Sequence, residues 1–234
     1  MATAAFTLAA VVPVFNETPA ALAAGVGAVC WDGFAQVLVA DASDNPAAKQ
    51  AAHALAQNAP ALSAVDCPRR GRARQMNHAA GRARATHLLF VHADTRLPPD
   101  AAARVQDAVL RGARWGRFDV QLDDRRAVFR MIAALINVRS AVSGIATGDQ
   151  AIFVERGLFE RLRGFRDIPL MEDVELSRRL KKTARPHRIR TPVLTSARRW
   201  REHGVARTVL LMWALRFLYF AGVAPHRLAV WYGR

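Results

Sequence analysis

Short apolar runs that alternate with helix-like segments are the feature that most restricts how this chain can fold. Runs typical of buried strands lie at residues 6–15, 36–40, 62–65 and 87–91. Segments of helical composition lie between and after them, at residues 20–29, 47–57, 72–84 and 98–110. This alternation predicts an α/β fold with a mostly parallel, Rossmann-like sheet flanked by helices. In such sheets ligands bind beyond the carboxyl ends of the strands.

The second half of the sequence is less regular. Polar and apolar residues alternate at 115–122 as in a strand, which could be antiparallel to its neighbours. Residues 151–154 form a short apolar run. Helical patterns cover residues 128–142, 172–180 and 205–221, and strand-like pieces lie at 187–189 and 193–194. Since neither a repeat nor a linker is found, we expect one domain over residues 1–234. Its core would span about residues 6–195 and a basic helical extension about 196–234.

The first two strand-like runs end in polar turns. Pro13, Asn16 and Glu17 follow the first run, and Asp41 ends the second. Each has an ordinary structural explanation, because Asn and Asp cap helices and are common where strands meet turns. A carboxylate at the position of Asp41 could instead accept a hydrogen bond from the imide N–H of a nucleobase. The coincidence of several polar strand ends favours ligand binding.

His92 and Asp94 follow the strand-like run at 87–91. Asp94 is placed to bind a divalent cation, which would in turn bind a diphosphate. The imidazole of His92 would suit Mn²⁺ somewhat better than Mg²⁺, and a hydrogen-bonded structural role is its alternative. Arg72 comes directly after Gly71 at a helix start, where arginines could hold phosphates or simply form a solvated basic face. The chain has neither a G-x-G-x-x-G nor a Walker A sequence.

Carboxylates gather between residues 148 and 175. Glu172, Asp173 and Glu175 begin a helix-like segment, and Asp149 lies in a turn upstream. Acidic residues in a first helical turn suit the positive end of the helix dipole, which is the structural explanation. The arginines that follow favour a catalytic one. A carboxylate beside basic groups can deprotonate one oxygen while the negative charge on another is stabilised.

The charge of the chain is strongly positive and unevenly spread. The formal net charge is +15, and the balance after residue 66 is +19. Such a field favours anionic partners: nucleic acid, phosphorylated small molecules or a membrane surface. The alternative is that the positive charge has no functional role and only reflects an arginine-rich composition, as in proteins from G+C-rich genomes. The two cysteines make no metal spacing and no disulfide framework, so we expect a cytoplasmic protein.

The last helical segment, residues 205–221, is apolar nearly all round but contains Arg216. A helix of this kind is either buried or in contact with lipid. Its apolar length is too short for a confident membrane span. The flanking arginines would also suit a helix that lies in a membrane interface. Packing on the sheet or on a second subunit remains the other interpretation.

Taken in order, these segments resemble the family 2 glycosyltransferases, which have the GT-A fold of nucleotide-diphospho-sugar transferases. The matching positions are the P-x-[aromatic]-N-E opening at Pro13–Glu17, the base-contacting acid at Asp41, the second Asp of the D-x-D motif at Asp94, the E-D pair at Glu172-Asp173 and the R-W end of Q-x-x-R-W at Arg199-Trp200. The segments GRARQMN, HADT, WGRFDV, GIATGDQAIFV, IPLMEDVELSRRL and SARRW together look most like a small bacterial subgroup labelled as arsenosugar-biosynthesis glycosyltransferases.

Two positions depart from the family pattern. His92 replaces the first Asp of D-x-D, which puts metal ligation by two carboxylates in doubt. Ser196 stands where the Gln of Q-x-x-R-W would be, which argues against a processive polymer synthase.

The resemblance implies metal-dependent transfer of a hexosyl or pentosyl unit from a nucleoside diphosphate sugar to an acceptor hydroxyl, with inversion. Asp173 would be the base and Glu172 the competing one. Donor-binding residues would be Pro13, Asn16, Glu17, Asp41, Arg72, Asp94 and Arg199. The acceptor side would comprise Gly148, Asp149, Gln150 and Trp200, and Asp94 with His92 would hold Mg²⁺ or Mn²⁺. The acceptor would be a small molecule or a lipid, no nucleic acid is expected, and peripheral contact with the inner face of an anionic membrane is in view.

Two rival functions stay open. A sugar nucleotidyltransferase shares the sheet architecture, but it would need a glycine-rich basic loop where this chain has PVFNE. A non-catalytic protein that binds membranes or RNA would use the basic segment after residue 66. It would show no dependence on Asp173, and its binding would weaken steeply with salt.

Overall fold

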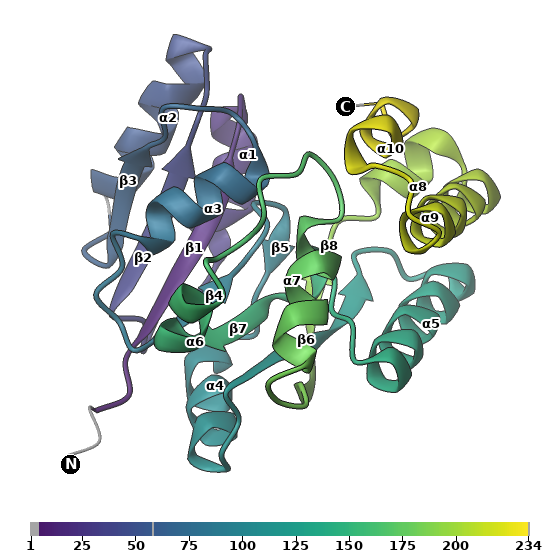
Figure 1. The fold of residues 1–234 in the computed structure, drawn as a ribbon. Coiled ribbons are helices and arrows are strands. Elements are labelled where there is room, and N and C mark those ends of the chain that lie inside the picture. Colours follow the sequence, from purple (N-terminus) through teal and green to yellow (C-terminus); the bar gives the residue numbers. More distant parts are fainter. Residues whose placement is uncertain (1–4, 58, 234) are drawn as a thin grey trace.

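The computed structural model describes residues 5–57 and 59–233. The predicted domain range 1–234 therefore includes residues 1–4, 58 and 234, which lie outside the described residues. Within the described part, eight strands form one sheet in the order β3-β2-β1-β4-β7-β6-β8-β5 (Figure 1). The strands are β1 (Leu8–Val14), β2 (Gln36–Asp41), β3 (Leu62–Asp66), β4 (His87–Phe90), β5 (Thr95–Arg96), β6 (Trp115–Leu122), β7 (Ile152–Glu155) and β8 (His187–Thr195).

The sheet is parallel in its N-terminal half and mixed in the other half. Strands β3, β2, β1 and β4 run parallel, as predicted. Strand β7 is antiparallel to both β4 and β6, whereas β6 and β8 are parallel to each other. The predicted antiparallel orientation of residues 115–122 is thus correct for the pairing of β6 with β7 but not for its pairing with β8. The α/β fold class is confirmed.

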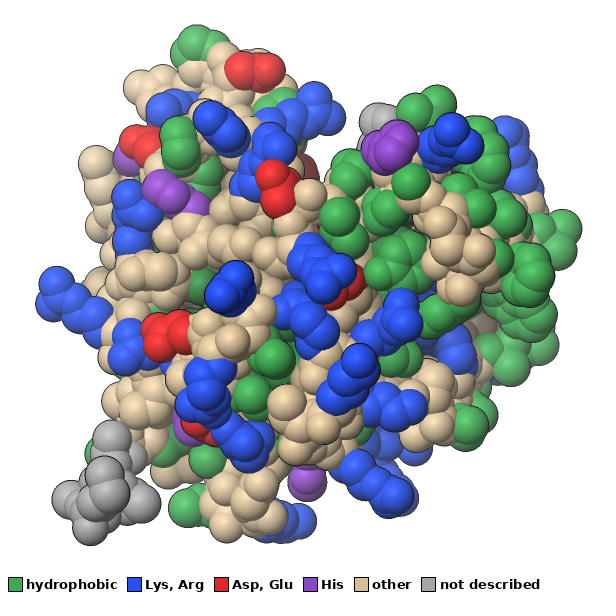
Figure 2. Space-filling view, viewed as in Figure 1, with side chains coloured by type: hydrophobic (Ala, Val, Ile, Leu, Met, Phe, Trp, Pro, Cys, Tyr) green, Lys and Arg blue, Asp and Glu red, His purple; other side chains and the backbone are tan. Residues whose placement is uncertain are grey.

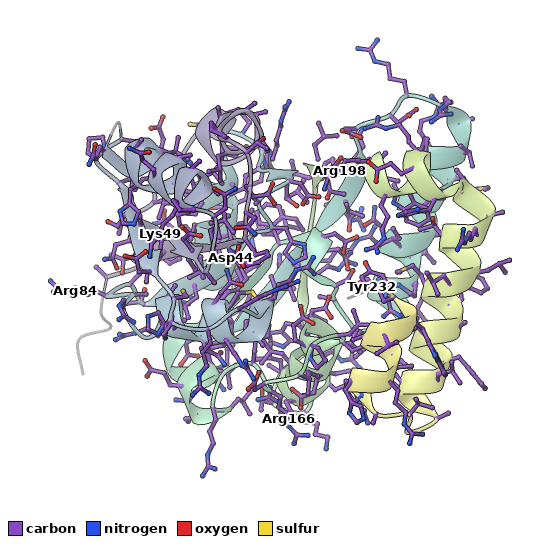
Figure 3. All side chains as sticks on the ribbon, turned by 90° about the horizontal axis from the view of Figure 1, so that it is seen from above. Asp44, Lys49, Arg84, Arg166, Arg198 and Tyr232 are labelled. Carbon is purple, nitrogen blue, oxygen red and sulfur yellow. The ribbon has the colours of Figure 1, made fainter. Side chains whose placement is uncertain are left out.

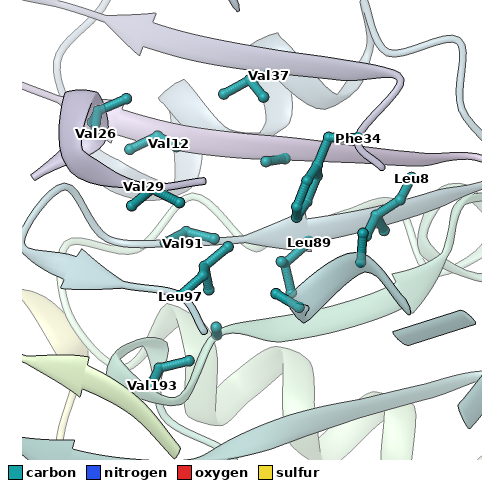
Figure 4. Packing of buried hydrophobic residues seen from close by; sticks show 14 of the residues in the cluster. Leu8, Val12, Val26, Val29, Phe34, Val37, Leu89, Val91, Leu97 and Val193 are labelled. Carbon is teal, nitrogen blue, oxygen red and sulfur yellow. The ribbon is translucent and has the colours of Figure 1, made fainter. Parts of the chain in front are cut away.

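Helices cover both faces of the sheet, and the alternation along β1 explains why. Its residues Leu8, Ala10 and Val12 join one apolar cluster, while Ala9 and Val11 join the cluster on the opposite face, since neighbouring side chains of a strand point to opposite faces. Figure 4 shows part of the first cluster. The first face is covered by α1 (Pro19–Ala24), α2 (Pro46–Gln57) and α4 (Ala101–Leu110), and the second by α3 (Arg72–Ala80), α6 (Arg156–Arg161) and α7 (Glu172–Lys181).

A further group of helices lies beside the sheet, to the right in Figure 1. It comprises α5 (Ala127–Ser143), α8 (Arg198–His203), α9 (Val205–Phe220) and α10 (Pro225–Trp231). Two apolar clusters attach it: Leu122 of β6 packs with α5, and Leu215 of α9 packs with Met171 and Val174. No helix that the structure describes is long and apolar enough to cross a membrane.

Three sequence-based boundaries are wrong. The helix predicted at residues 72–84 ends at Ala80. The helix predicted at residues 20–29 ends at Ala24 and is followed by a 3₁₀ turn, η1 (Val26–Ala28). The chain passes so close to β4's loop here that a Cβ on Gly25 would lie 2.1 Å from the carbonyl oxygen of Ala93. The two strand-like pieces near residues 187 and 194 are one strand, β8, whose pairing with β6 shifts register between Phe118 and Asp119.

Candidate active site

A cleft of about 730 Å³ opens at the carboxyl ends of β1 and β4. Figure 2 shows the molecule hollowed at the top of the view, between the sheet and the C-terminal helices. Most of the side chains that line the cleft come from the ends of β1, β4, β6 and β8, from β5 and from the starts of α3 and α8. They include Pro13, Phe15, Glu17, Arg70, Arg72, Gln75, His92, Asp94, Arg96, Asp123, Thr195 and Arg198.

Five of the sequence-predicted residues therefore share this cleft: Pro13, Glu17, Arg72, His92 and Asp94. The start of α3 delivers its arginines because Gly71 adopts φ 133°, which only glycine adopts readily. Next to it the guanidinium of Arg70 lies 4.3 Å from the centre of the Phe15 ring. One rim of the cleft is therefore cationic.

Asn16 and Asp41 lie beside the cleft rather than on its wall. Asn16 donates from Nδ2 to Asp44 Oδ1 at 2.6 Å and accepts at Oδ1 from the Asn45 backbone N–H at 3.1 Å. It thereby ties the turn after β1 to the loop after β2. Asp41 accepts at Oδ1 from the Ser43 backbone N–H at 2.8 Å. Its buried Oδ2 has no hydrogen-bond partner among the described residues, and such an orphaned acceptor suits a donor supplied by a ligand.

Asp173 and Glu172 lie at the first turn of α7. The residue before them, Met171, has φ 67°, a strained conformation for a residue with a side chain. Asp173 accepts from the Gly148 backbone N–H at Oδ2 and from the Val174 backbone N–H at Oδ1, both at 2.7 Å. Glu172 is buried, with its Oε1 3.8 Å from Nη1 of Arg72 on the cleft wall.

Gly148 connects the acidic helix to the cleft. A Cβ on Gly148 would lie 2.3 Å from Nε2 of His92, so the imidazole packs directly on the backbone of this glycine. Because the same residue holds Asp173, the end of β4 and the start of α7 meet here. The acidic turn predicted upstream of α7 thus lies next to the E-D pair.

Asp149 and Gln150 complete this turn, the 3₁₀ helix η2 (Gly148–Gln150). Gln150 is buried and closes a capping box with Thr147, accepting the Thr147 backbone N–H at 3.2 Å. Burial raises the pKa of Asp149 above the ordinary value of a carboxyl, although the charge of Arg139 opposes this.

Arg199 and Trp200 do not line the cleft. Arg199 donates from Nη2 to the Tyr232 carbonyl at 3.2 Å, and its guanidinium lies 3.7 Å from the centre of the Tyr232 ring. Trp200 packs against the apolar cluster of Leu122 and Phe129. In this segment Ser196 and Arg198 lie on the cleft wall instead. Seen from above, Arg198 and Tyr232 both lie where the sheet meets the C-terminal helices (Figure 3).

Asp94 is the residue best placed to hold a metal. Among the described residues, no group of three or more His, Cys, Asp or Glu side chains is arranged to bind an ion. A cation that binds a diphosphate needs fewer protein ligands, since Mg²⁺ usually takes one or two carboxylates and completes its shell with phosphate oxygens and water. Asp94 on the cleft wall, with His92 two residues before it, fits that mode.

Sequence reasoning missed some residues of the cleft. Gln75 is buried and donates from Nε2 to the carbonyls of Val14 at 2.6 Å and Ala40 at 2.9 Å, which clamps the ends of β1 and β2 together. Asp123 ends β6 on the cleft wall and accepts the Ala197 backbone N–H at 2.6 Å. Asp123 could have been found from its place directly after a strand-like run. Gln75 could have been found because it is a polar residue on the apolar side of α3.

Comparison with known proteins identifies the family and the fold. Residues 9–162 match the family model described as "Glycosyl transferase family 2". No curated protein sequence matches the chain. Among solved structures it is similar to the mannosyltransferase PcManGT of Pyrobaculum calidifontis in complex with GDP-Man and Mn²⁺, with a TM-score of 0.60 and 21% identity over 81% of this chain and 56% of that one.

It is also similar to residues 1–349 of S. aureus TarS in complex with UDP, with a TM-score of 0.59 and 16% identity over 82% of this chain and 60% of that one. At these identities the likeness concerns the fold. The chain spans 56% and 60% of the length of the two structures.

Proposed function

This chain belongs to glycosyl transferase family 2, and on that premise we propose that it moves a hexosyl or pentosyl unit from a nucleoside diphosphate sugar to an acceptor hydroxyl, with inversion. The observation that carries the proposal is the junction at Gly148. There the carboxylate of Asp173 is fixed next to a cleft that holds Arg70, Arg72, Arg96 and Arg198. Such a site has a proton acceptor on one side and cations for a leaving diphosphate on the other.

The donor would lie in the cleft. Asp41 would accept a hydrogen bond from the nucleobase at its unpartnered Oδ2, and Pro13, Asn16 and Glu17 would shape the nucleoside side. Asp94, with His92 beside it, would hold Mg²⁺ or Mn²⁺, whose charge would offset that of the diphosphate. The Mn²⁺ in the mannosyltransferase structure supports this choice of ion.

The chemistry would consist of one displacement. The acceptor oxygen attacks the anomeric carbon as the bond from that carbon to the diphosphate oxygen breaks, and Asp173 takes the hydroxyl proton. Negative charge then develops on the diphosphate, where the arginines of the cleft stabilise it. Glu172, held near Arg72, would be the competing base. Gly148, Asp149 and Gln150 would form the acceptor side, and Arg199 and Trp200 would act through the packing of the C-terminal helices.

A screen of donors tests this function. Nucleoside diphosphate release is measured from UDP-, GDP- and dTDP-sugars with Mg²⁺ and with Mn²⁺, without added acceptor. We expect one nucleotide class to be hydrolysed and Arg72→Met to weaken its binding. Arg84→Met is the matched control, because Arg84 lies in the loop before β4, whereas the cleft is at the carboxyl end of that strand. Figure 3 shows Arg84 at the left margin of the molecule. Failure to bind any of these donors would contradict the proposal.

The finer assignments remain proposals of the same kind. A role in arsenosugar biosynthesis is supported by the resemblance of short sequence segments, and the acceptor would then be a small molecule. A cytoplasmic location is supported by the cysteine pattern. Weak peripheral contact with an anionic membrane, and with it a lipid acceptor, is favoured by the exposed apolar side chains Leu210, Trp213, Phe217, Phe220, Val230 and Trp231 on α9 and α10, which Figure 2 shows as a green area on the right.

A further inference from the structure

Arg216 is a charged residue within an otherwise apolar stretch of α9. It follows Leu215, which is buried against Met171 and Val174 at the start of α7. Arg216 therefore lies close to the first turn of α7 and is half-buried. Burial lowers the pKa of Arg216, while the charges of Asp173 and Asp149 raise it. Partial removal of a cation from water is costly unless a group nearby makes use of its charge.

A second arginine, Arg139 of α5, approaches the same place from the other side. Its Nη2 donates to Oγ1 of Thr147 at 3.4 Å, directly before η2. Its Nη1 is buried and has no hydrogen-bond partner among the described residues. Burial first, and then the charge of Arg216, lower the pKa of Arg139 to about 10. Two guanidinium groups from different helices thus repel each other beside the turn that holds Asp173.

The nearby carboxylates do not pair with them directly. Among the described residues, no ion pair within 4 Å joins Arg139 or Arg216 to Asp149 or Asp173. The two oxygens of Asp173 instead accept hydrogen bonds from backbone N–H groups. Burial raises the pKa of Asp149, which favours its neutral form. A bound oxyanion would accept a hydrogen bond from the unpartnered N–H of Arg139 and would offset the charge of both arginines. Guanidinium groups are suited to this because they donate two parallel hydrogen bonds to phosphate and carboxylate oxygens.

We propose that Arg139 and Arg216 bind an anionic group, a phosphate or a carboxylate, that the sugar acceptor carries next to the hydroxyl it presents to Asp173. This inference rests on the proposed function, because it takes Asp173 as the base. It narrows the acceptor to an anionic hydroxyl compound. It also gives a role to Arg216, the one charged residue in the second half of α9. This residue belongs neither to the strand-end motifs nor to the cleft.

The test uses the full chain with its donor cleft filled. The protein is saturated with the nucleoside diphosphate that the donor screen selects, so that the cleft arginines are occupied. Inorganic phosphate and, in a separate arm, acetate are then titrated by calorimetry at low ionic strength. We expect one of the two anions to bind, and Arg139→Met and Arg216→Met each to weaken that binding at least tenfold.

Matched controls come from the same two helices. Arg130 of α5 and Arg207 of α9 are exposed, so Arg130→Met and Arg207→Met should leave the affinity within twofold of the wild type. If a methionine variant does not fold, Arg139→Lys and Arg216→Lys keep the charge but lose the paired donors, and each should weaken binding several-fold. The arm that binds identifies the anion as a phosphate or a carboxylate.

Two outcomes would overturn the inference: neither anion binds the nucleotide-saturated wild type, or the control variants lose as much affinity as the others. Loss in all four variants would mean a general effect of surface charge. A wild type that does not bind the nucleotide at all would instead contradict the proposed function, so the two failures are distinguishable.

Discussion

Asp173 differs from the other acids of its helix in what it contacts. Glu175 pairs with Arg166 at 2.9 Å and with Arg179 one turn along, so it fastens α7 to the preceding loop. Glu172 lies near Arg72. Among the described residues, no Lys, Arg or His nitrogen lies within 4 Å of Asp173, whose two oxygens accept backbone N–H bonds. Three carboxylates in one helical turn thus have three different environments.

Replacement of Asp173 by Asn should remove transfer while leaving donor binding intact. The amide keeps the size of the side chain but cannot take a proton, and general-base catalysis contributes about 10²–10⁴-fold to a rate. We expect a drop of that order in turnover with the nucleotide dissociation constant within about twofold of wild type. Steady-state transfer and calorimetry measure the two. Glu172→Gln should be the milder change, and near-wild-type turnover of Asp173→Asn would reject the base.

Asp94 should matter only when a divalent cation is present. Asp94→Ala is expected to weaken nucleotide-sugar binding in Mg²⁺ or Mn²⁺ and to leave the residual binding in excess chelator unchanged. Chelator should also inactivate the wild type. The measurement is a donor titration of both proteins with and without metal, and an equal loss in the two conditions would make Asp94 a structural residue.

At the scale of elements, the pairing of β6 with β8 depends on a buried ion pair. Arg117 and Asp119 of β6 are both buried and in contact, and Arg188 of β8 reaches Asp119 Oδ2 at 2.7 Å. Burial alone would raise the pKa of Asp119, but the hydrogen bonds from Arg188 and Arg117 outweigh it and hold that pKa below 3.8. The charged form is therefore the one that the fold stabilises.

Asp119→Asn should accordingly destabilise the protein in a pH-dependent way. Removal of the charge leaves Arg117 buried without its counter-ion, which costs about 3–5 kcal/mol. A depressed pKa contributes stability above the unfolded-state value and loses it as the pH falls through the folded-state value. The difference in urea midpoint between wild type and variant should be full near pH 6 and shrink below 3.8. A difference that stays constant down to pH 2.5 would contradict this.

The N-terminal elements could be predicted because their signals are local. Strand β1 reads as a continuous apolar run since both of its faces are buried, and parallel strands of this kind need no partner information. The insertion of β7 between β4 and β6 could not be read from the sequence, because it depends on pairing across about 60 residues. Which side of α8 faces the cleft could not be predicted from the sequence either. The sequence motif therefore pointed to Arg199, although Arg198 lines the cleft.

At the scale of the whole molecule, the C-terminal helices leave apolar side chains uncovered by the described chain. On α9 the Phe217 side chain is 73% exposed, and elsewhere only a few large apolar residues, such as Leu110 of α4 at 75%, are comparable. The prediction of one domain, with a core of about residues 6–195 and an extension from about 196, stays a prediction. The extension contains α8, α9 and α10, and its apolar residues between 205 and 221 stand beside the basic ones in the sequence.

Liposome flotation tests the membrane proposal. We expect weak binding to anionic vesicles that is lost on neutral vesicles or in high salt, because the basic residues supply part of the attraction. Phe217→Ser should weaken partitioning by roughly 10- to 150-fold, since full burial of one such side chain contributes about 1.5–3 kcal/mol and each 1.4 kcal/mol is tenfold. Leu110→Ser, matched in exposure but on α4, should leave it unchanged. Failure of the wild type to float in every condition would leave only a packing role for α9.

The strand order has a consequence for how the chain emerges from the ribosome. The parallel half, β3-β2-β1-β4, can assemble once residue 90 is available, but the partner of β4 is β7, which begins at Ile152. At synthesis rates of about 5–20 residues per second, β4 stays an open apolar edge for roughly 3–12 seconds. An edge of Leu88, Leu89 and Phe90 is the kind that pairs with other chains. A nascent chain stalled between these points should therefore be the form that most needs a chaperone.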